Sequence, residues 1–315
     1  VKSSLEEIVI PDTVTTIAAS AFSECTALTS LTIDWNKITS IGSSAFSNCT
    51  SLPTYDELNL PNLTDLGGSA FNNVNIRKWS NMGKITSLPA PSNSVHTLYT
   101  FGNPAVLEEV ILPYTLTSLP MNCFKNYVAL SKIHLPSTII SIGREAFSEC
   151  RSLPSSMTLD KVEILGQHAF LGCSSLEEVY LPSIIEIANG GNFRGCFSGC
   201  TNLKKIHIGP NCTLIGSYLR SYGSNGSDFT IICEAVTPPT LGSSILHAAV
   251  NVELEAIYVP AASLTAYREA TNWIDYASRI FPIEDYMDGG IITFADPVVE
   301  ALCVANWDTN NSGYM

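Results

Sequence analysis

The chain has 315 residues, with 45% apolar and 14% charged side chains, and its 29 acidic and 16 basic residues give a formal net charge of −13. So many apolar residues beside so few charges exclude an intrinsically disordered chain. The excess of acidic residues argues against binding to nucleic acid or to an anionic membrane surface, since both require a basic patch. No apolar run approaches the roughly 18 residues of a spanning helix, which argues against insertion into a membrane.

A repeated pattern begins at Leu5. It reads Leu-x-x-Ile-x-Ile-Pro, continues through spaced apolar residues to an Ala-Phe pair, and ends on a cysteine before the leucine that opens the next unit. The opening leucines lie at 5, 28 and 52, and again at 107, 130, 153 and 176, so the intervals within each run are 23 or 24 residues. These intervals fall inside the ~20–29 residues of leucine-rich repeats. The repeat therefore favours one extended array over the two globular domains that the length alone would allow.

Each unit predicts one coil of a solenoid. The alternating apolar residues at its start are typical of a short strand with one buried face, and the proline ends the strand because it cannot donate to a ladder. One coil cannot cover its own apolar face, whereas stacked neighbours can. We therefore predict an α/β repeat solenoid, a right-handed leucine-rich-repeat superhelix of about ten coils over residues 1–283 with a parallel β-sheet on one face. A separate tail is expected over residues 284–315.

Three places depart from the repeat. Residues 76–106 form an irregular unit that contains several prolines, and two glycine-rich insertions lie at 189–192 and around 222–226. Insertions in solenoids map to loops on one face, which is often the binding face. Tolerated growth of a surface loop is the alternative explanation.

The repeat is clearest over residues 130–153, where it reads Leu-x-x-Ile-x-Leu-Pro-x-x-Ile-x-x-Ile-Gly-x-x-Ala-Phe-x-x-Cys-x-x-Leu. This pattern resembles the BspA-like leucine-rich-repeat family, and the resemblance extends from Leu5 to Ile283. The segment from Ile231 onward is similar to the closing C-terminal unit of that family. The resemblance implies a surface or secreted protein, and the role proposed for such proteins is adhesion to host proteins or to other cells.

The tail from residue 290 resembles a linking module of some Bacteroides-type surface proteins. Asp308, Asn310 and Ser312 match positions 1, 3 and 5 of an EF-hand-like loop, and Gly313 matches position 6. The chain ends at position 8 of this loop, so the acidic ligand expected at position 12 is missing. We therefore expect no cofactor here, and calcium only in a longer parent protein that supplies the missing ligand. A longer parent is also expected because the chain opens on Val1 at the edge of a repeat.

The ten cysteines follow the repeat. Five of them share one column, whose members are Cys25, Cys49, Cys150, Cys173 and Cys200. Others exchange with alanine and valine at equivalent positions, so we expect them to be small, buried and largely reduced core residues. An occasional disulfide between stacked coils is the alternative. We find no zinc-type spacing, phosphate loop or nucleophile elbow, so nothing in the sequence supports an enzyme.

The alternation within the strands predicts which side chains face solvent. The residue between the two buried positions of a strand points outward, and this column contains Val9, Thr32, Asn59, Ile111, His134, Thr158, Tyr180 and His207. Its C-terminal half carries aromatic and apolar side chains beside two lysines. The candidate partner-binding residues are therefore Ile111, Lys132, His134, Tyr180, Lys205 and His207. Ordinary cross-strand pairing on an exposed sheet is the alternative interpretation.

Three functions fit this surface. The first is a cell-surface or extracellular recognition and adhesion module that binds, as a monomer, a host extracellular-matrix protein or a microbial surface protein through the sheet face. The second is a glycan-binding module that stacks sugars on Trp35, Trp79, Tyr99 or Tyr180, although the four tryptophans are scattered along the chain. The third is a structural spacer that displays further domains.

Overall fold

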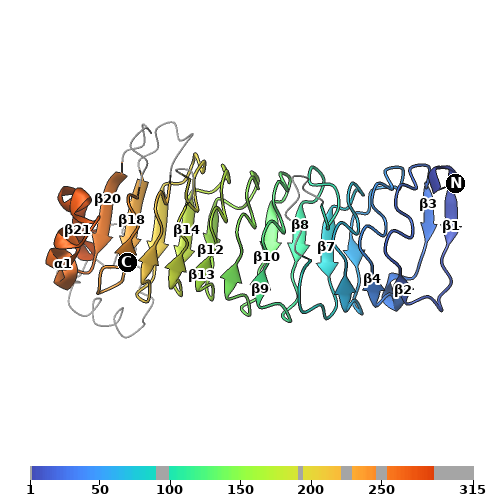
Figure 1. The fold of residues 1–315 in the computed structure, drawn as a ribbon, viewed down its shortest axis with the longest axis horizontal. Coiled ribbons are helices and arrows are strands. Elements are labelled where there is room, and N and C mark those ends of the chain that lie inside the picture. The colour runs from blue at the N-terminus through green and yellow to red at the C-terminus, as the bar shows by residue number, and fades with distance from the viewer. Residues whose placement is uncertain (1, 90–98, 191–193, 221–228, 246–253, 287–315) are drawn as a thin grey trace, which may run out of the picture.

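The computed structural model describes residues 2–89, 99–190, 194–220, 229–245 and 254–286. These residues form an elongated stack of about ten coils, with the N-terminus at one end and the helix α1 (Leu264–Glu269) at the other (Figure 1). The predicted leucine-rich-repeat solenoid is confirmed. Helix contributes little to it, since α1 is the only α-helix within the described ranges.

The longer strands of the coils line one side of the stack and form what we call the first ladder, in which every strand pair is parallel. Its pairing is interrupted between Thr32 and Leu58 and between His134 and Ser156, so it consists of three sheets. Equivalent repeat positions lie opposite one another, as Ile8 and Leu31 do, and as Ile133 and Val110 do. The repeat phase therefore fixes the register. The strands are β1 (Glu7–Val9), β3 (Ser30–Thr32), β5 (Leu58–Asn59), β7 (Lys78–Asn81), β8 (Glu109–Ile111), β10 (Lys132–His134), β12 (Ser156–Thr158), β14 (Glu178–Leu181), β16 (Lys205–Ile208), β18 (Phe229–Cys233), β20 (Leu254–Val259) and β21 (Ile280–Pro282).

A second ladder runs along another side of the coils, whereas the sequence predicted a sheet on one face only. Its strands have two residues each. A strand this short shows no alternation of apolar and polar residues that would distinguish it from a turn in the sequence. All of its pairs are parallel. The strands are β2 (Thr16–Ile17), β4 (Ser40–Ile41), β6 (Asp65–Leu66), β9 (Ser118–Leu119), β11 (Ser141–Ile142), β13 (Ile164–Leu165), β15 (Glu186–Ile187), β17 (Leu214–Ile215) and β19 (Thr240–Leu241).

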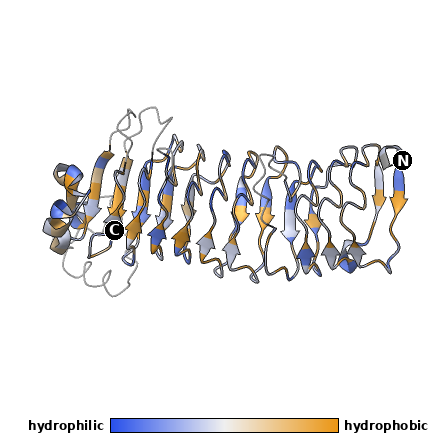
Figure 2. Cartoon of the chain, in the orientation of Figure 1, coloured by the Kyte–Doolittle hydropathy of each residue, from blue (hydrophilic) through white to orange (hydrophobic). Residues whose placement is uncertain are grey.

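The phenylalanine column forms the centre of the core. Phe124, Phe147 and Phe170 are fully buried and stack face to face, with ring centroids 5.5 and 5.2 Å apart. A coil that stood alone would expose its ring on both sides, so the stack ties each coil to its neighbours. Figure 2 shows that apolar residues recur in coil after coil along the whole molecule.

The irregular unit keeps this core continuous by using a tryptophan. Trp79 lies edge-on between Phe71 and Phe101, at centroid distances of 5.3 and 5.6 Å, and its indole N–H donates to the carbonyl of Phe101 at 2.9 Å. A larger ring thus fills the place where the repeat loses its phase. One hydrophobic cluster extends from Ile17 to Ile280 without a break.

The turn that carries the Ala-Phe pair requires left-handed backbone. The residue before the alanine and the residue two positions after the phenylalanine both have positive φ in most coils, as Ser44 and Asn48 do at 56° and 62°. Asparagine tolerates this region better than most residues, and glycine adopts it freely. Gly172 and Gly199 accordingly occupy the second of these positions in two C-terminal coils.

The C-terminal end of the stack is closed by α1 and by short 3-10 turns. Tyr267 and Trp273 are buried there; the hydroxyl of Tyr267 donates to the carbonyl of Ala235 at 2.7 Å, and the indole N–H of Trp273 donates to that of Pro239 at 2.8 Å. None of the described helices is long and apolar enough to cross a membrane. The 3-10 turns are η1 (Lys2–Ser4), η2 (Trp35–Lys37), η3 (Ala261–Ser263), η4 (Ile274–Arg279) and η5 (Ile283–Asp285).

The ring stack yields a stability prediction. Phe147→Ala removes a ring that packs between two others and leaves a cavity, so we expect the free energy of unfolding to fall by about 3–5 kcal/mol in urea denaturation. Val9→Ala, at a position that is 63% exposed, is the control and should cost less than about 1 kcal/mol. Equal losses for the two variants would contradict the central role of the stack.

Candidate functional site

The outer surface of the first ladder changes character along the molecule. The outward column predicted from the sequence is largely confirmed. Its exposed members are Val9, Thr32, Asn59, His134 and Thr158, and its half-buried members are Ile111, Tyr180 and His207. Small or polar side chains occupy most of the N-terminal strands, and larger rings occupy the C-terminal ones.

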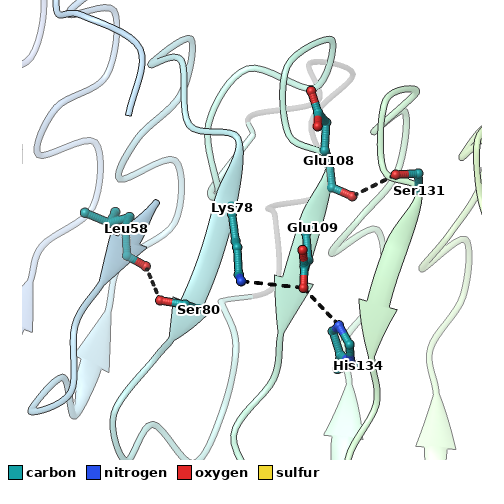
Figure 3. A network of polar contacts seen from close by, with 7 residues as sticks. All are labelled: Leu58, Lys78, Ser80, Glu108, Glu109, Ser131 and His134. Atoms are coloured by element: carbon teal, nitrogen blue, oxygen red, sulfur yellow. Dashed lines mark hydrogen bonds and ion pairs between the residues drawn. The ribbon is translucent and has the colours of Figure 1, made fainter. Parts of the chain in front are cut away.

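Glu109 on β8 organises the middle of this surface. Its Oε1 atom lies 3.0 Å from Nε2 of His134 and 3.8 Å from Nζ of Lys78, so three neighbouring strands meet at one carboxylate (Figure 3). Lys132 lies opposite Glu109 in the register but is exposed, and it forms no ion pair with any described residue. The structure thus brings together Lys132 and His134, and it leaves the lysine available to a partner.

Tyr180 and His207 form a stacked pair further along the ladder. They lie opposite each other on β14 and β16, with ring centroids 4.2 Å apart and planes inclined by 11°. The hydroxyl of Tyr180 donates to Oε2 of Glu178 at 3.1 Å. Both rings are therefore held in one orientation before any partner binds, which lowers the entropic cost of an interface.

The expected exposure of Lys205 is wrong. Lys205 is only 8% exposed; its Nζ lies 3.2 Å from Oε1 of Glu178 and 5.4 Å from the centre of the Tyr286 ring. Tyr286 follows η5, in the segment expected to belong to a separate tail, and it packs back against the outer surface of the first ladder. The repeat columns could not reveal this contact because Tyr286 lies outside them. Lys205 therefore positions Glu178, which in turn holds Tyr180.

The outward column continues into strands that the sequence prediction did not include. Ile232, Tyr258 and Phe281 follow His207 in the register of β18, β20 and β21. Tyr258 is half-buried, and its ring centroid lies 6.0 Å from that of Phe281 and 4.8 Å from that of Tyr286. Ile232 is buried at 3% exposure. The alternation in residues 256–260 was the signal that could have identified Tyr258.

The proposed sugar platforms are not exposed rings. Trp79 is fully buried, Trp35 packs against the core, and Tyr99 lies edge-on against a buried tyrosine at 5.4 Å. Only Tyr180 remains on the outer surface, and His207 covers one of its faces. The prediction of a stacking face is therefore wrong for Trp79, and Trp35 and Tyr99 are half-buried.

Other predicted features lie mostly or wholly outside the described residues. These are the insertion at 189–192, of which 191–192 lie outside, the insertion around 222–226, and the EF-hand-like residues Asp308, Asn310 and Ser312. Within the described ranges, no three His, Cys, Asp or Glu side chains are grouped so that they could hold a metal ion.

The nine described cysteines are buried and free, as the repeat columns predict for all of them except Cys233, which was assigned to no column. Several thiols donate to the carbonyl of a phenylalanine in the preceding coil; Cys150 does so to Phe124 at 2.9 Å, and Cys173 does so to Phe147 at 3.0 Å. Burial raises the pKa of the Cys49 and Cys212 thiols to about 12. These thiols are therefore protonated at neutral pH, and they are poor nucleophiles.

Comparison with known proteins gives one family and several related folds. The family model for the BspA-type leucine-rich-repeat region matches in six copies, over residues 2–98, 97–225 and 192–235. A leucine-rich-repeat protein from Bacteroides ovatus is similar in structure, with a TM-score of 0.51 at 19% identity over 89% of this chain and 84% of that chain. This likeness supports the solenoid fold.

Two further structures are less similar. A leucine-rich cell-surface protein from Faecalibacterium prausnitzii has a TM-score of 0.38 at 25% identity, over 64% of this chain and 59% of that chain. The pneumococcal vaccine antigen PcpA has a TM-score of 0.49 at 21% identity, over 89% of this chain and 66% of that chain. Among curated proteins, none matches the chain significantly.

Burial of the thiols predicts their reactivity. In the native protein near pH 8, a thiol reagent should label the nine described cysteines far more slowly than it labels a free thiol, because all nine are buried away from solvent. After denaturation without a reductant, most of the ten thiols of the chain should titrate at once. If almost none titrated, the cysteines would form disulfides instead.

The same pKa shifts predict how stability depends on pH. The unfolded thiol titrates near 9.0, whereas Cys49 and Cys212 titrate near 12 when folded. The folded state therefore keeps protons that the unfolded chain releases, and the free energy of unfolding should fall as pH rises from about 9 to about 12. In Cys49→Val the thiol is replaced by valine, the residue found at the equivalent repeat position 74. This variant should lose less of its free energy of unfolding between about pH 9 and about pH 12. An unchanged pH dependence would show that Cys49 does not contribute to it.

Proposed function

We propose that the chain, which belongs to the BspA-type leucine-rich-repeat family, is a non-catalytic recognition module that binds a partner protein through the outer surface of the first ladder. The observation that carries the proposal is the change in the outward column. Thr32 and Asn59 occupy positions that become Tyr180 and His207 in the C-terminal half. The inward columns stay the same, so the coil itself does not require the aromatic rings.

The rings have the properties of interface anchors. Tyrosine provides a large contact area with little loss of entropy and is enriched at protein interfaces. Tyr180 is also held in advance by Glu178 and His207. Tyr258 and Phe281 extend the aromatic surface toward the C-terminal end.

Polar groups lie beside these anchors, as they do at the rim of most interfaces. Lys132 and His134 are exposed two strands before Tyr180, and the half-buried Ile111 lies beside His134. With Lys205 excluded by its burial, the proposed binding surface consists of Ile111, Lys132, His134, Tyr180, His207 and Tyr258.

A glycan ligand is disfavoured by the arrangement of the rings. Sugars stack on open ring faces, but Tyr180 and His207 turn one face of each ring toward the other at 4.2 Å. A pure spacer would leave the change in the outward column without a role. We propose a protein partner of the kind found in the host extracellular matrix or on microbial surfaces, bound by a monomer at the cell surface or outside the cell. The resemblance to the family supports the proposed location and role.

Identifying the partner requires an unbiased capture. The immobilised chain would be presented with purified extracellular-matrix proteins and mucin, and in parallel with a glycan array. Capture of one protein with no selective glycan binding supports the proposal. Selective glycan binding with no captured protein would replace the protein partner by a sugar, and no binding at all would favour the spacer.

The double variant Tyr180→Ala/His207→Ala tests the surface. It leaves every inward column intact, so the solenoid should fold normally. Truncation of anchoring aromatics typically costs about 2 kcal/mol or more, so affinity for the captured partner should fall at least roughly thirtyfold in a titration.

A matched control lies on the same column. Thr32→Ala/Asn59→Ala changes two outward positions of the N-terminal strands and should leave the affinity within about twofold of the original, because their side chains lie outside the aromatic surface. A folded Tyr180→Ala/His207→Ala variant with unchanged affinity would move the binding site away from the first ladder.

A further inference from the structure

The second ladder changes from polar to apolar at two outward columns. The two residues that precede the buried position of each strand line these columns. One column is formed by the first residue of each strand, and the other by the residue directly before the strand. In the coils of β2, β4, β6 and β9 both columns are polar, and their residues are Thr15, Thr16, Thr39, Ser40, Thr64, Asp65, Thr117 and Ser118. The equivalent residues of the next coils include Ile140, Ile164, Ile185 and Leu214.

These isoleucines are on the surface. Ile140, Ile164 and Ile185 are 47%, 45% and 39% exposed, and Leu214 is half-buried. The backbone places them in adjacent coils, because the N–H of Ile164 donates to the carbonyl of Ile140 at 3.2 Å, and Leu214 donates to Ile185 at the same distance. The four apolar residues therefore lie in four successive coils of the second ladder.

The coil does not need apolar residues at these positions. In other coils the threonine hydroxyl donates to the carbonyl of the preceding coil, as in Thr64 to Thr39 at 3.0 Å and Thr213 to Ile185 at 3.2 Å. Isoleucine gives up this hydrogen bond and remains exposed to water. Contiguous apolar surface with a polar surround is typical of an interaction site.

Two carboxylates lie among the apolar residues. Glu163 stands in one column between Ile140 and Ile185, and Glu186 stands in the other between Ile164 and Leu214. Both are half-buried, and no cationic side chain among the described residues pairs with either. The surface therefore combines apolar area with unpaired negative charge.

We propose that this second-ladder patch, made of Ile140, Glu163, Ile164, Ile185, Glu186 and Leu214, binds a protein segment that is both apolar and basic. The apolar residues of the segment would cover the isoleucines, and its lysines or arginines would pair with the two carboxylates. A second copy of this chain is the weaker occupant. It would place carboxylates against carboxylates, and each chain carries a net charge of −13.

A simple probe is a synthetic peptide of alternating leucine and lysine, titrated into the full chain at about 0.15 M salt, where exposed charges more than about 8 Å apart are largely screened. A peptide with glutamate in place of lysine is the control for charge. The lysine peptide should bind at one saturable site, and the glutamate peptide should not. Equal binding of the two peptides, or dimers of the chain alone in analytical ultracentrifugation, would overturn the proposal.

Two double variants locate the site. Ile140→Thr/Ile185→Thr restores the residue type of the other coils, so the fold should be kept, and it should weaken binding of the lysine peptide at least about tenfold. Glu163→Gln/Glu186→Gln removes the charges at nearly constant shape and should have a similar effect.

Two control variants exclude a general charge effect and binding of the peptide to the first ladder. Glu6→Gln/Glu108→Gln neutralises two exposed carboxylates that directly precede β1 and β8 and should leave binding within about twofold, because distant exposed charges are screened. Tyr180→Ala/His207→Ala should also leave it unchanged. If Glu6→Gln/Glu108→Gln lowered the affinity as much as Glu163→Gln/Glu186→Gln, the peptide would be responding to net charge and the proposed patch would be wrong.

Discussion

No coil of this molecule can bury its own apolar face. Its phenylalanine, its cysteine and the inward residues of its two strands are covered only when the next coil stacks in the same register, with rings such as Phe147 and Phe170 5.2 Å apart. A shift of one residue between coils would turn the inward side chains outward. Register is therefore the constraint on which both ladders, the turns and the core depend.

The same constraint explains which features the sequence could predict. Residues that must match in every coil leave a periodic signal, so the solenoid, the first ladder and the burial of the cysteines follow from spacing alone. Lys205 shows where periodicity stops, because its environment is set by Tyr286, which belongs to no repeat. The second ladder was not predicted because strands of two residues show no periodic pattern. Tyr258 was not predicted because the outward column was not extended into the closing unit.

The outward positions are free of the register constraint. A coil holds equally well with Thr32 or with Tyr180 between its inward residues, and with Thr117 or Ile140 before its second strand. The solenoid thus separates two tasks that compact folds mix. Inward columns determine stability, and outward columns can vary coil by coil to form surfaces of different chemistry, aromatic on the first ladder and apolar-acidic on the second.

The arrangement of the two ends gives the molecule a mechanical property. The first coil and the helix α1 lie at opposite ends of the long axis (Figure 1), and the backbone hydrogen bonds between coils run along that axis. Tension between the ends pulls directly on these bonds, so coils detach one at a time rather than together. A stacked coil of 23 residues contributes one strand spacing, about 4.8 Å, to the length of the molecule. The same coil contributes roughly 80 Å once it is detached and extended. Under a pulling force the solenoid becomes an extensible tether, and it yields from its ends while the coils between them stay stacked.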